Sequence, residues 1–387
     1  MLRRSAALAL LLASPVAAPL AAQSSLEEAL AGAKLHLEVR GRYEHAEDEA
    51  GSKTANAPTV RTVLGFTTAP LKGIQASLDF ANVTAIGGER YNSGLNGHTQ
   101  YALVQDPGQT QALQAYLQGY GFKVGRQILS FDNQRFVGPG AWSQMPKTFT
   151  AALFENKTWI PRTEFTVGHL FSIHTSLGVN RDLSGEVARL RWSPDERVAL
   201  TPFWYGIEET TNPLTSYQHL GLRADGAFHW LTYEASVAQQ RPYQDGLTPQ
   251  RMYRMGSIGA KGAAWSARYV EERLESGFQT PLSSLHGFYG WSDRIGITPA
   301  GGLVDRYVQS TVKVGAFDGE AQAHRFNADQ DGLLYGREVD LSLSWKATKA
   351  WTLLAAIGRY WGDDGAPAAG SLNKNLSKFW LMTTYRF

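Results

Sequence analysis

The carboxy-terminal stretch Lys378–Phe387, with the sequence KFWLMTTYRF, decides the fold of this chain. Successive side chains of a β-strand point to opposite faces of its sheet. At that period one face consists of Phe379, Leu381, Thr383, Tyr385 and Phe387, and the other of Trp380, Met382, Thr384 and Arg386. The stretch therefore predicts an amphipathic strand that ends on an aromatic residue.

A strand of this kind at the end of a long chain needs a pairing partner, and in lipid only a closed sheet leaves no edge unpaired. The terminus resembles the closing strand of bacterial outer-membrane β-barrels, in which the barrel assembly machinery reads the last residues. On this resemblance Tyr385 and Phe387 form the assembly signal. The alternative is the terminal strand of a soluble β-sandwich.

The composition fits a large barrel. The 387 residues include 39 Gly, 16 Tyr, 17 Phe and 11 Trp, as turns and interfacial aromatic girdles require, while only 43% are hydrophobic. There is no cysteine, which excludes disulfides and thiolate metal sites. Without the leader, basic and acidic residues balance at 35 each, which argues against a nucleic-acid partner.

The amino terminus predicts secretion. Residues 1–22 combine Arg3 and Arg4, a short apolar run and a small-residue end at Ala21 and Ala22, which is typical of a cleaved signal peptide. Residues 23–387 are then the barrel domain, preceded by a short helix within Ser24–Ala33. We expect the outer membrane as the location, and its lipid and lipopolysaccharide, together with the assembly machinery, as partners.

Alternating segments recur along the whole mature chain. Leu35–His45 places Leu35, Leu37, Val39 and Tyr43 opposite four ionisable side chains, and Gly336–Lys346 alternates as clearly. Eighteen such segments can be counted, although sixteen also fits. The fold class is therefore all-β, a transmembrane antiparallel barrel, with long extracellular loops expected near 87–109, 129–148 and 274–305.

Two stretches, which include parts of these loops, carry a family resemblance. The first contains Gly125-Arg126-Gln127 and Asp132-Asn133-Gln134-Arg135-Phe136-Val137-Gly138, followed by Trp142. The second contains Phe278-Gln279-Thr280-Pro281-Leu282 and then His286, Trp291, Asp293 and Thr298-Pro299. With Trp345 and the terminal strand, they resemble the alginate export porin family of Gram-negative outer membranes. The resemblance implies an eighteen-stranded barrel whose basic lumen passes an anionic polyuronate.

The first loop also has a reading from its residues alone. Arg126 and Arg135 either bind an anion or pair with lumen carboxylates in a latch that ties the loop to the barrel wall. Loop residues predicted to constrict the pore are Asp132, Asn133, Trp142 and Trp291. The second loop is rich in aromatic residues, Gly and Pro, which is typical of a compact loop that either narrows the pore or packs on its neighbours.

Charged side chains set the selectivity of a wide pore. By alternation, the basic residues predicted to face inward are Arg40, Arg42, Arg61, Arg189, Arg191, Arg223, Arg254, Arg268 and Lys313. The corresponding acids are Glu38, Asp79, Glu234 and Asp340. The excess of basic residues favours anions, but a register error of one residue moves any of them to the other face.

No catalytic pattern stands out. His169 and His174 are five apart in a predicted strand and so are expected on opposite faces, and no Gly-x-Ser-x-Gly elbow or zinc-ligand spacing occurs. His286 and Asp293 are read as packed loop residues. We therefore expect no enzyme, no metal and no cofactor, but an outer-membrane channel for small hydrophilic, anionic solutes such as uronate-type saccharides. The alternatives are a weakly selective general porin and a structural or adhesion barrel.

Overall fold

The computed structural model describes residues 25–51 and 53–387. The predicted signal peptide, residues 1–22, lies outside this part. The strands are β1 Lys34–Asp48, β2 Ala55–Thr67, β3 Gln75–Ala85, β4 Gln109–Gly119, β5 Phe122–Gln127, β6 Thr148–Asn156, β7 Thr163–His174, β8 Asn180–Asp195, β9 Val198–Glu209, β10 Tyr217–Phe228, β11 Leu231–Pro242, β12 Arg251–Lys261, β13 Trp265–Leu274, β14 Leu303–Val314, β15 Phe317–Asn327, β16 Leu334–Lys346, β17 Trp351–Gly362 and β18 Leu376–Arg386.

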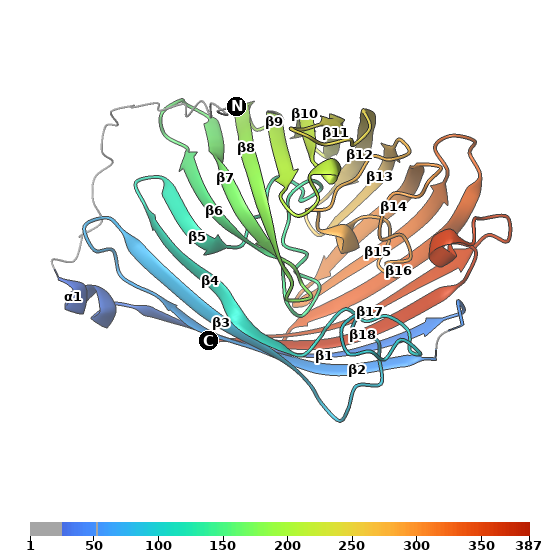
Figure 1. The fold of residues 1–387 in the computed structure, drawn as a ribbon, viewed down its shortest axis with the longest axis horizontal. Coiled ribbons are helices and arrows are strands. Elements are labelled where there is room, and N and C mark those ends of the chain that lie inside the picture. Colours follow the sequence, from blue (N-terminus) through green and yellow to red (C-terminus); the bar gives the residue numbers. More distant parts are fainter. Residues whose placement is uncertain (1–24, 52) are drawn as a thin grey trace.

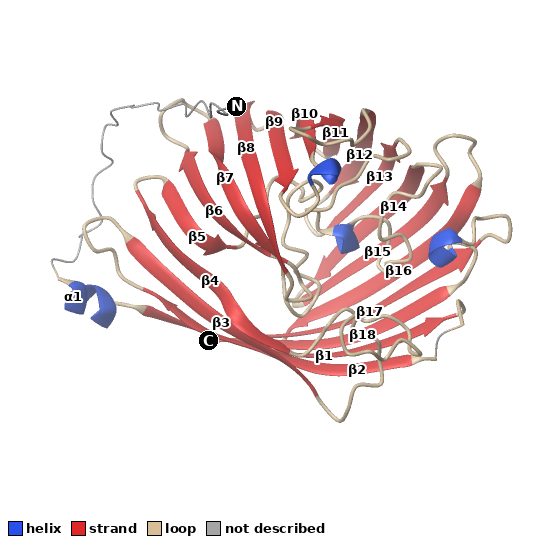
Figure 2. Ribbon diagram, viewed as in Figure 1, coloured by secondary structure: helices blue, strands red, loops and turns tan. Residues whose placement is uncertain are grey.

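These strands form one closed antiparallel barrel (Figures 1 and 2). Each strand pairs with its neighbours in sequence, and β1 pairs with β18, from Glu38 opposite Arg386 to Asp48 opposite Leu376. The predicted barrel with eighteen strands is confirmed, and both sixteen strands and the soluble sandwich are excluded. Closure matters because it removes every sheet edge.

The face assignments of the terminal strands agree with the alternation of the sequence. In β18, Leu376 and Trp380 are buried inside, while Leu381 and Tyr385 are 48% and 46% exposed on the outside. In β1, Leu35 is 68% exposed outside, whereas Arg40 faces inward. An apolar exterior around a polar interior is what a barrel in lipid requires.

The two ends of the barrel differ. One end carries short connections such as Tyr120–Gly121 and 229–230, together with helix α1 Leu26–Ala31, the start of β1 and the end of β18. The other end carries the long loops, observed at 86–108, 128–147, 275–302 and 363–375. In outer-membrane barrels the short turns are periplasmic and the long loops extracellular. Among the described residues no helix is long and apolar enough to cross a membrane.

Helix α1 and three short 3-10 helices are the only helices among the described residues. Ser25 caps α1 through the Glu28 backbone, and the Ala69 backbone N–H donates to the Ala29 carbonyl, which docks the helix on the turn after β2. The 3-10 helices are Pro213–Thr215, Leu285–Gly287 and Ala369–Ser371. Two long loops, 128–147 and 275–302, lie within the ring of strands (Figure 1).

Candidate functional site: the loop-constricted lumen

Loop 128–147 crosses the lumen. It leaves β5, yet the Arg40 guanidinium of β1 donates to the Gln144 side chain at 2.8 Å and to the Ala141 carbonyl at 3.1 Å. At the loop tip, Asn133 Nδ2 donates to Glu234 Oε1 of β11 at 2.9 Å. Because these contacts reach strands far apart around the barrel, the loop divides the channel cross-section.

Arg135 joins the two inward loops to the wall. Its Nε lies 2.8 Å from Glu272 Oε1 of β13, its Nη1 donates to Thr280 Oγ1 at 3.0 Å, and Tyr289 accepts from its Nη2. The side chain is fully buried, and the Phe288 ring lies 4.7 Å from the guanidinium. Burial would lower the pKa of Arg135, but the Glu272 carboxylate more than reverses this and holds the pKa above its usual value.

Arg135 is therefore a latch residue. The prediction that it lines the pore is corrected, since its guanidinium is enclosed by loops 128–147 and 275–302 and is not offered to a solute. The reading of this stretch as a latch is the one that fits the contacts.

Aromatic side chains form a second junction between the loops and the wall. The Trp142 ring stacks on His286 with centroids 4.2 Å apart and meets Trp380 of β18 edge-on at 5.3 Å. Trp291 lies 6.4 Å from Trp142 and is largely buried. Trp142 and Trp291 therefore hold the loops against β18.

Loop 275–302 also covers carboxylates on β16. The Ser292 backbone N–H and hydroxyl donate to the two oxygens of Glu338 at 2.7 and 2.6 Å, and the Trp291 N–H faces Asp340 Oδ2 at 3.4 Å. The backbone approaches so closely at Gly290, where φ is +81°, that a Cβ would lie 2.4 Å from the Glu338 carboxylate. Only glycine fits there without displacing the loop.

Asp293 anchors the same loop through charge. Its carboxylate lies 3.0 Å from His286 Nδ1 and 3.3 Å from Lys378 Nζ of β18. Burial would raise the pKa of Asp293, but His286 and Lys378 outweigh it and hold the pKa well below its usual range. The carboxylate is thus charged throughout the neutral and mildly acidic range.

This shift predicts a pH window. A lowered pKa in the folded state stabilises the anchored loop above the ordinary Asp pKa of about 3.9, and the contribution disappears as the pH falls through the lower folded value. Single-channel records should therefore show little effect of this anchor between pH 7 and pH 5 and growing open-state noise below about pH 4. Asp293→Asn should show that noise already at pH 7; a variant as quiet as the wild type would refute the anchor.

The wall on the periplasmic side of the loops carries a charge network. Its four guanidiniums share three carboxylates, in the pairs Arg189–Asp132 at 2.6 Å, Arg191–Asp225 at 2.8 Å, Arg223–Asp225 at 3.6 Å, Arg223–Glu234 at 2.9 Å and Arg268–Glu234 at 3.7 Å. Asp132 thus connects the loop tip to Arg189 of β8, and Asn133 connects it to Glu234 of β11. With four guanidiniums and three carboxylates, the network has a net charge of +1.

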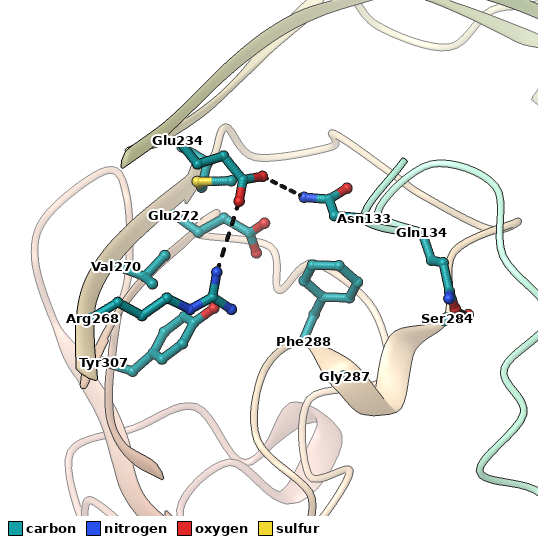
Figure 3. A pocket seen from close by; sticks show the side chains of 11 residues that line it. Asn133, Gln134, Glu234, Arg268, Val270, Glu272, Ser284, Gly287, Phe288 and Tyr307 are labelled. Carbon is teal, nitrogen blue, oxygen red and sulfur yellow. Dashed lines mark hydrogen bonds and ion pairs between the residues drawn. The ribbon is translucent and has the colours of Figure 1, made fainter. Parts of the chain in front are cut away.

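Part of this network opens into a cavity of about 280 Å³ beneath the loops (Figure 3). In the figure, Glu234 lies between Arg268 and Asn133, and the Phe288 ring points toward the same space as Glu272 and Tyr307. The Arg268 side chain is 39% exposed and the Arg191 side chain 28%, against 22% for Asp225 and 12% for Glu234. The guanidinium groups are therefore the more accessible charges of the network.

A larger cavity, about 620 Å³, opens toward the long-loop end. Its lining includes the basic residues Arg42, Lys147, Arg294 and Lys378. Burial lowers the pKa of Lys147 to about 8. Arg42 donates to the Trp142 carbonyl at 2.7 Å and is neutralised by Glu44 and Asp106, so like Arg40 and Arg61 it faces inward but is buried against loop 128–147.

Arg126 lies at the junction of β4, β5 and β6. Its Nε donates to Thr148 Oγ1 at 2.9 Å and a terminal nitrogen donates to the Gln111 side chain, so its described hydrogen-bond partners are neutral.

Arg254 corrects another prediction. It alternates with Tyr253, which is fully buried and packs on Phe278, and it shares the exposed face of β12 with Ile258. Arg254 therefore points away from the lumen and does not line the channel.

The catalytic candidates do not assemble. A β-bulge between Leu170 and Ser172 breaks the alternation on which the separation of His169 and His174 was argued. The two histidines still have different partners: His169 faces Glu186 at 3.5 Å and His174 faces Thr150 at 3.1 Å. Within residues 25–51 and 53–387 no group of His, Asp and Glu could hold a metal ion.

Several residues of the site were not singled out from the sequence. They are Asp106, Gln144, Glu272, Ser292, Glu338 and Lys378. Glu338 alternates with the apolar Val339 and was recognisable as an inward residue, whereas Glu272 lies between Glu271 and Arg273, so its face does not follow from alternation. Their loop partners come from segments more than 40 residues away, which no periodicity reveals.

No family model matches the chain, and no curated protein matches it in sequence. Several solved structures match the chain in fold. OccAB1 of Acinetobacter baumannii superposes with a TM-score of 0.70 at 11% identity, over 94% of this chain and 99% of that one. OccK1 (OpdK) of Pseudomonas aeruginosa gives 0.70 at 13%, and OpdK with vanillate gives 0.69 at 14%, each over 92% of this chain and 99% of that one.

At such low identity the likeness shows the fold. Membership in the alginate export porin family stays a prediction. The closed barrel, its apolar exterior and these structures together make the chain a β-barrel of the outer membrane, with the build of a channel narrowed by two inward loops.

Proposed function

We propose that the protein is an outer-membrane channel for small anionic solutes, organic carboxylates and uronate-type saccharides among them. The observation that carries the proposal is the unequal exposure of charge in the lumen. Arg268 and Arg191 are the most exposed members of the wall network, at 39% and 28% of their side chains, whereas its carboxylates Asp225, Glu234 and Asp132 are 22%, 12% and 9% exposed.

Other carboxylates of the interior are hidden as well. Glu272, Asp305, Glu338 and Asp340 are each at most 3% exposed beneath loop 275–302. A solute passing the loops therefore meets guanidinium groups that are more exposed than the carboxylates of the wall network, and guanidinium groups bind carboxylates bidentately. One similar structure, OpdK, was solved with vanillate, a small carboxylate.

The ion preference tests this proposal. In a planar bilayer under a KCl gradient, the reversal potential of the mature protein should show preference for chloride. Replacing Arg191 and Arg268 together by Gln should abolish or reverse the preference, since both accessible positive charges are lost and Asp225 and Glu234 are left less compensated. Arg197→Gln, an exposed arginine in the short β8–β9 turn, is the control and should keep the wild-type potential.

Added solutes separate the alternatives. Block by short oligouronates or vanillate that weakens in the double variant supports an anionic-solute channel. Weak ion preference without block makes the protein a general porin, and absence of conductance makes it a structural or adhesion barrel. Arg126→Gln is tested in parallel, because a guanidinium with neutral partners keeps its full charge.

A further inference from the structure

The outer face of six consecutive strands carries one arginine each near the long-loop end. These are Arg254 on β12, Arg273 on β13, Arg306 on β14, Arg325 on β15, Arg337 on β16 and Arg359 on β17. Each lies within four residues of the long-loop end of its strand, and each alternates with an inward neighbour that is largely buried, such as Tyr253, Glu272 or Glu338. Together they form an outward arginine band.

The sheet register places these arginines side by side. Arg254 is directly opposite Arg273, Arg306 is opposite Arg325, and Arg325 is opposite Arg337. Like charges in directly opposed positions destabilise a sheet. Three such pairs in one band therefore need an anion close by.

The protein itself supplies little of the negative charge that these arginines need. Arg306 pairs with Glu271 at 2.8 Å and Arg273 pairs with Asp329, but Glu271 is the one carboxylate at the outward positions of these six strands, all of which are described. Arg325 and Arg359 have the neutral partners Asn327 and Ser377. The side chains of Arg254 and Arg337 have no hydrogen bond or ion pair with any residue in 25–51 and 53–387.

The band lies at the edge of the apolar surface. Below Arg337 on the same face of β16 come Val339, Leu341, Leu343 and Trp345, all exposed. The eight-residue span from Arg337 to Trp345 is roughly 26 Å along the strand at ~3.3 Å per residue. With a strand tilt of roughly 35–45°, this span rises about 20 Å along the barrel axis, which is most of the apolar band of an outer-membrane barrel, ~25 Å tall. The guanidiniums therefore sit at headgroup level.

The long-loop end faces the cell exterior, so this is the level of the outer leaflet. We propose that the arginine band binds the phosphate groups of phosphorylated glucosamine lipids, the lipid A part of lipopolysaccharide. Arginine forks match phosphate bidentately. The fit is local to this side of the barrel: at the corresponding end of β8 and β9 the outward charged residues are the acids Glu186 and Glu208.

Native mass spectrometry of the full-length mature barrel with bis-phosphorylated lipid A tests this. The triple variant Arg254→Gln, Arg325→Gln, Arg337→Gln should lower the affinity by about 10- to 100-fold, given the usual contribution of a basic residue at an anionic membrane surface. The control variant Arg197→Gln, Lys261→Gln, Lys349→Gln removes three exposed charges at the short-turn end and should bind like the wild type.

Dephosphorylated lipid A should bind weakly to all forms, because it lacks the phosphates that the arginines bind. Inorganic phosphate should not compete, because it lacks the acyl chains that add contact with the apolar surface. Equal binding by the triple variant, or binding that ignores the phosphates, would overturn the proposal. So would a dimer of the barrel that disappears in the triple variant, since the acidic β8–β9 face of a second copy would then be the occupant. The result is independent of conductance and so of the proposed channel function.

Discussion

Arg135→Ala is expected to raise the single-channel conductance several-fold while the barrel stays closed. The substitution removes the common partner of Glu272, Thr280 and Tyr289 and leaves the buried Glu272 carboxylate without a cation, although the Tyr253 hydroxyl still donates to it. Breaking a buried ion pair in this way costs about 3–5 kcal/mol. The other anchors of loops 128–147 and 275–302 remain, such as Arg40 on Gln144 and Ser292 on Glu338, so the loop segments around Arg135 should move apart and widen the lumen while the rest of each loop stays docked.

Two measurements separate an open gate from a misfolded barrel. Heat-modifiable mobility on a gel should be unchanged, because the strand ladder does not involve Arg135. Limited trypsin digestion should become fast at Lys147 and Arg294, which are shielded in the latched loops. Arg135→Ala with Glu272→Gln should recover part of the loss, since no charge then remains unpaired. Unchanged conductance with the loops released would show that they do not constrict the pore.

Trp142→Ala is expected to have the second largest effect, an increase in current noise and a partial rise in conductance. The indole stacks on His286, meets Trp380 edge-on and supplies the carbonyl that Arg42 contacts. Full burial of a tryptophan is worth ~3–5 kcal/mol, and because Trp142 is only half-buried we expect about 2–3 kcal/mol. The loop should then fluctuate between docked and undocked positions rather than leave the lumen.

The matched control is Trp345→Ala, which removes an indole of the same size from the exposed outer face of β16. It should leave the current as quiet as in the wild type. Combining Trp142→Ala with His286→Ala should add little to the single change, because the two rings stack on one another. Additive effects would mean that Trp142 acts through other contacts.

Much of the barrel was predictable from the chain. Strict alternation in Leu35–His45 gave the correct inner and outer faces, since large apolar and charged residues differ in parity there. In the terminal strand it separated the outward Leu381 and Tyr385 from the inward Lys378 and Trp380. The same rule failed for Arg254. Its strand is rich in Gly and Ser, whose small side chains suit either face, and only the burial of Tyr253 and the exposure of Ile258 settle the register.

The fate of the arginines could not be read from the sequence in the same way. Arg40, Arg42 and Arg135 occupy inward positions or an inward loop, yet each is buried. Loop 128–147 folds over the wall and supplies acceptors to Arg40 and Arg42, whereas the acceptors of Arg135 come from β13 and loop 275–302. Such contacts join residues about 100 or more positions apart, and loop conformation follows packing rather than period. Arg191 and Arg268 remain accessible because no loop covers them.

The sequence by itself determined a closed barrel of alternating strands, because side-chain period and a terminal amphipathic strand are local properties that lipid and water enforce residue by residue. Only the tertiary structure decided which charges are accessible in the lumen and which lie on the outer face at the long-loop end. Those outcomes depend on strand register and on where two long loops come to rest, and both are fixed by contacts between distant parts of the chain.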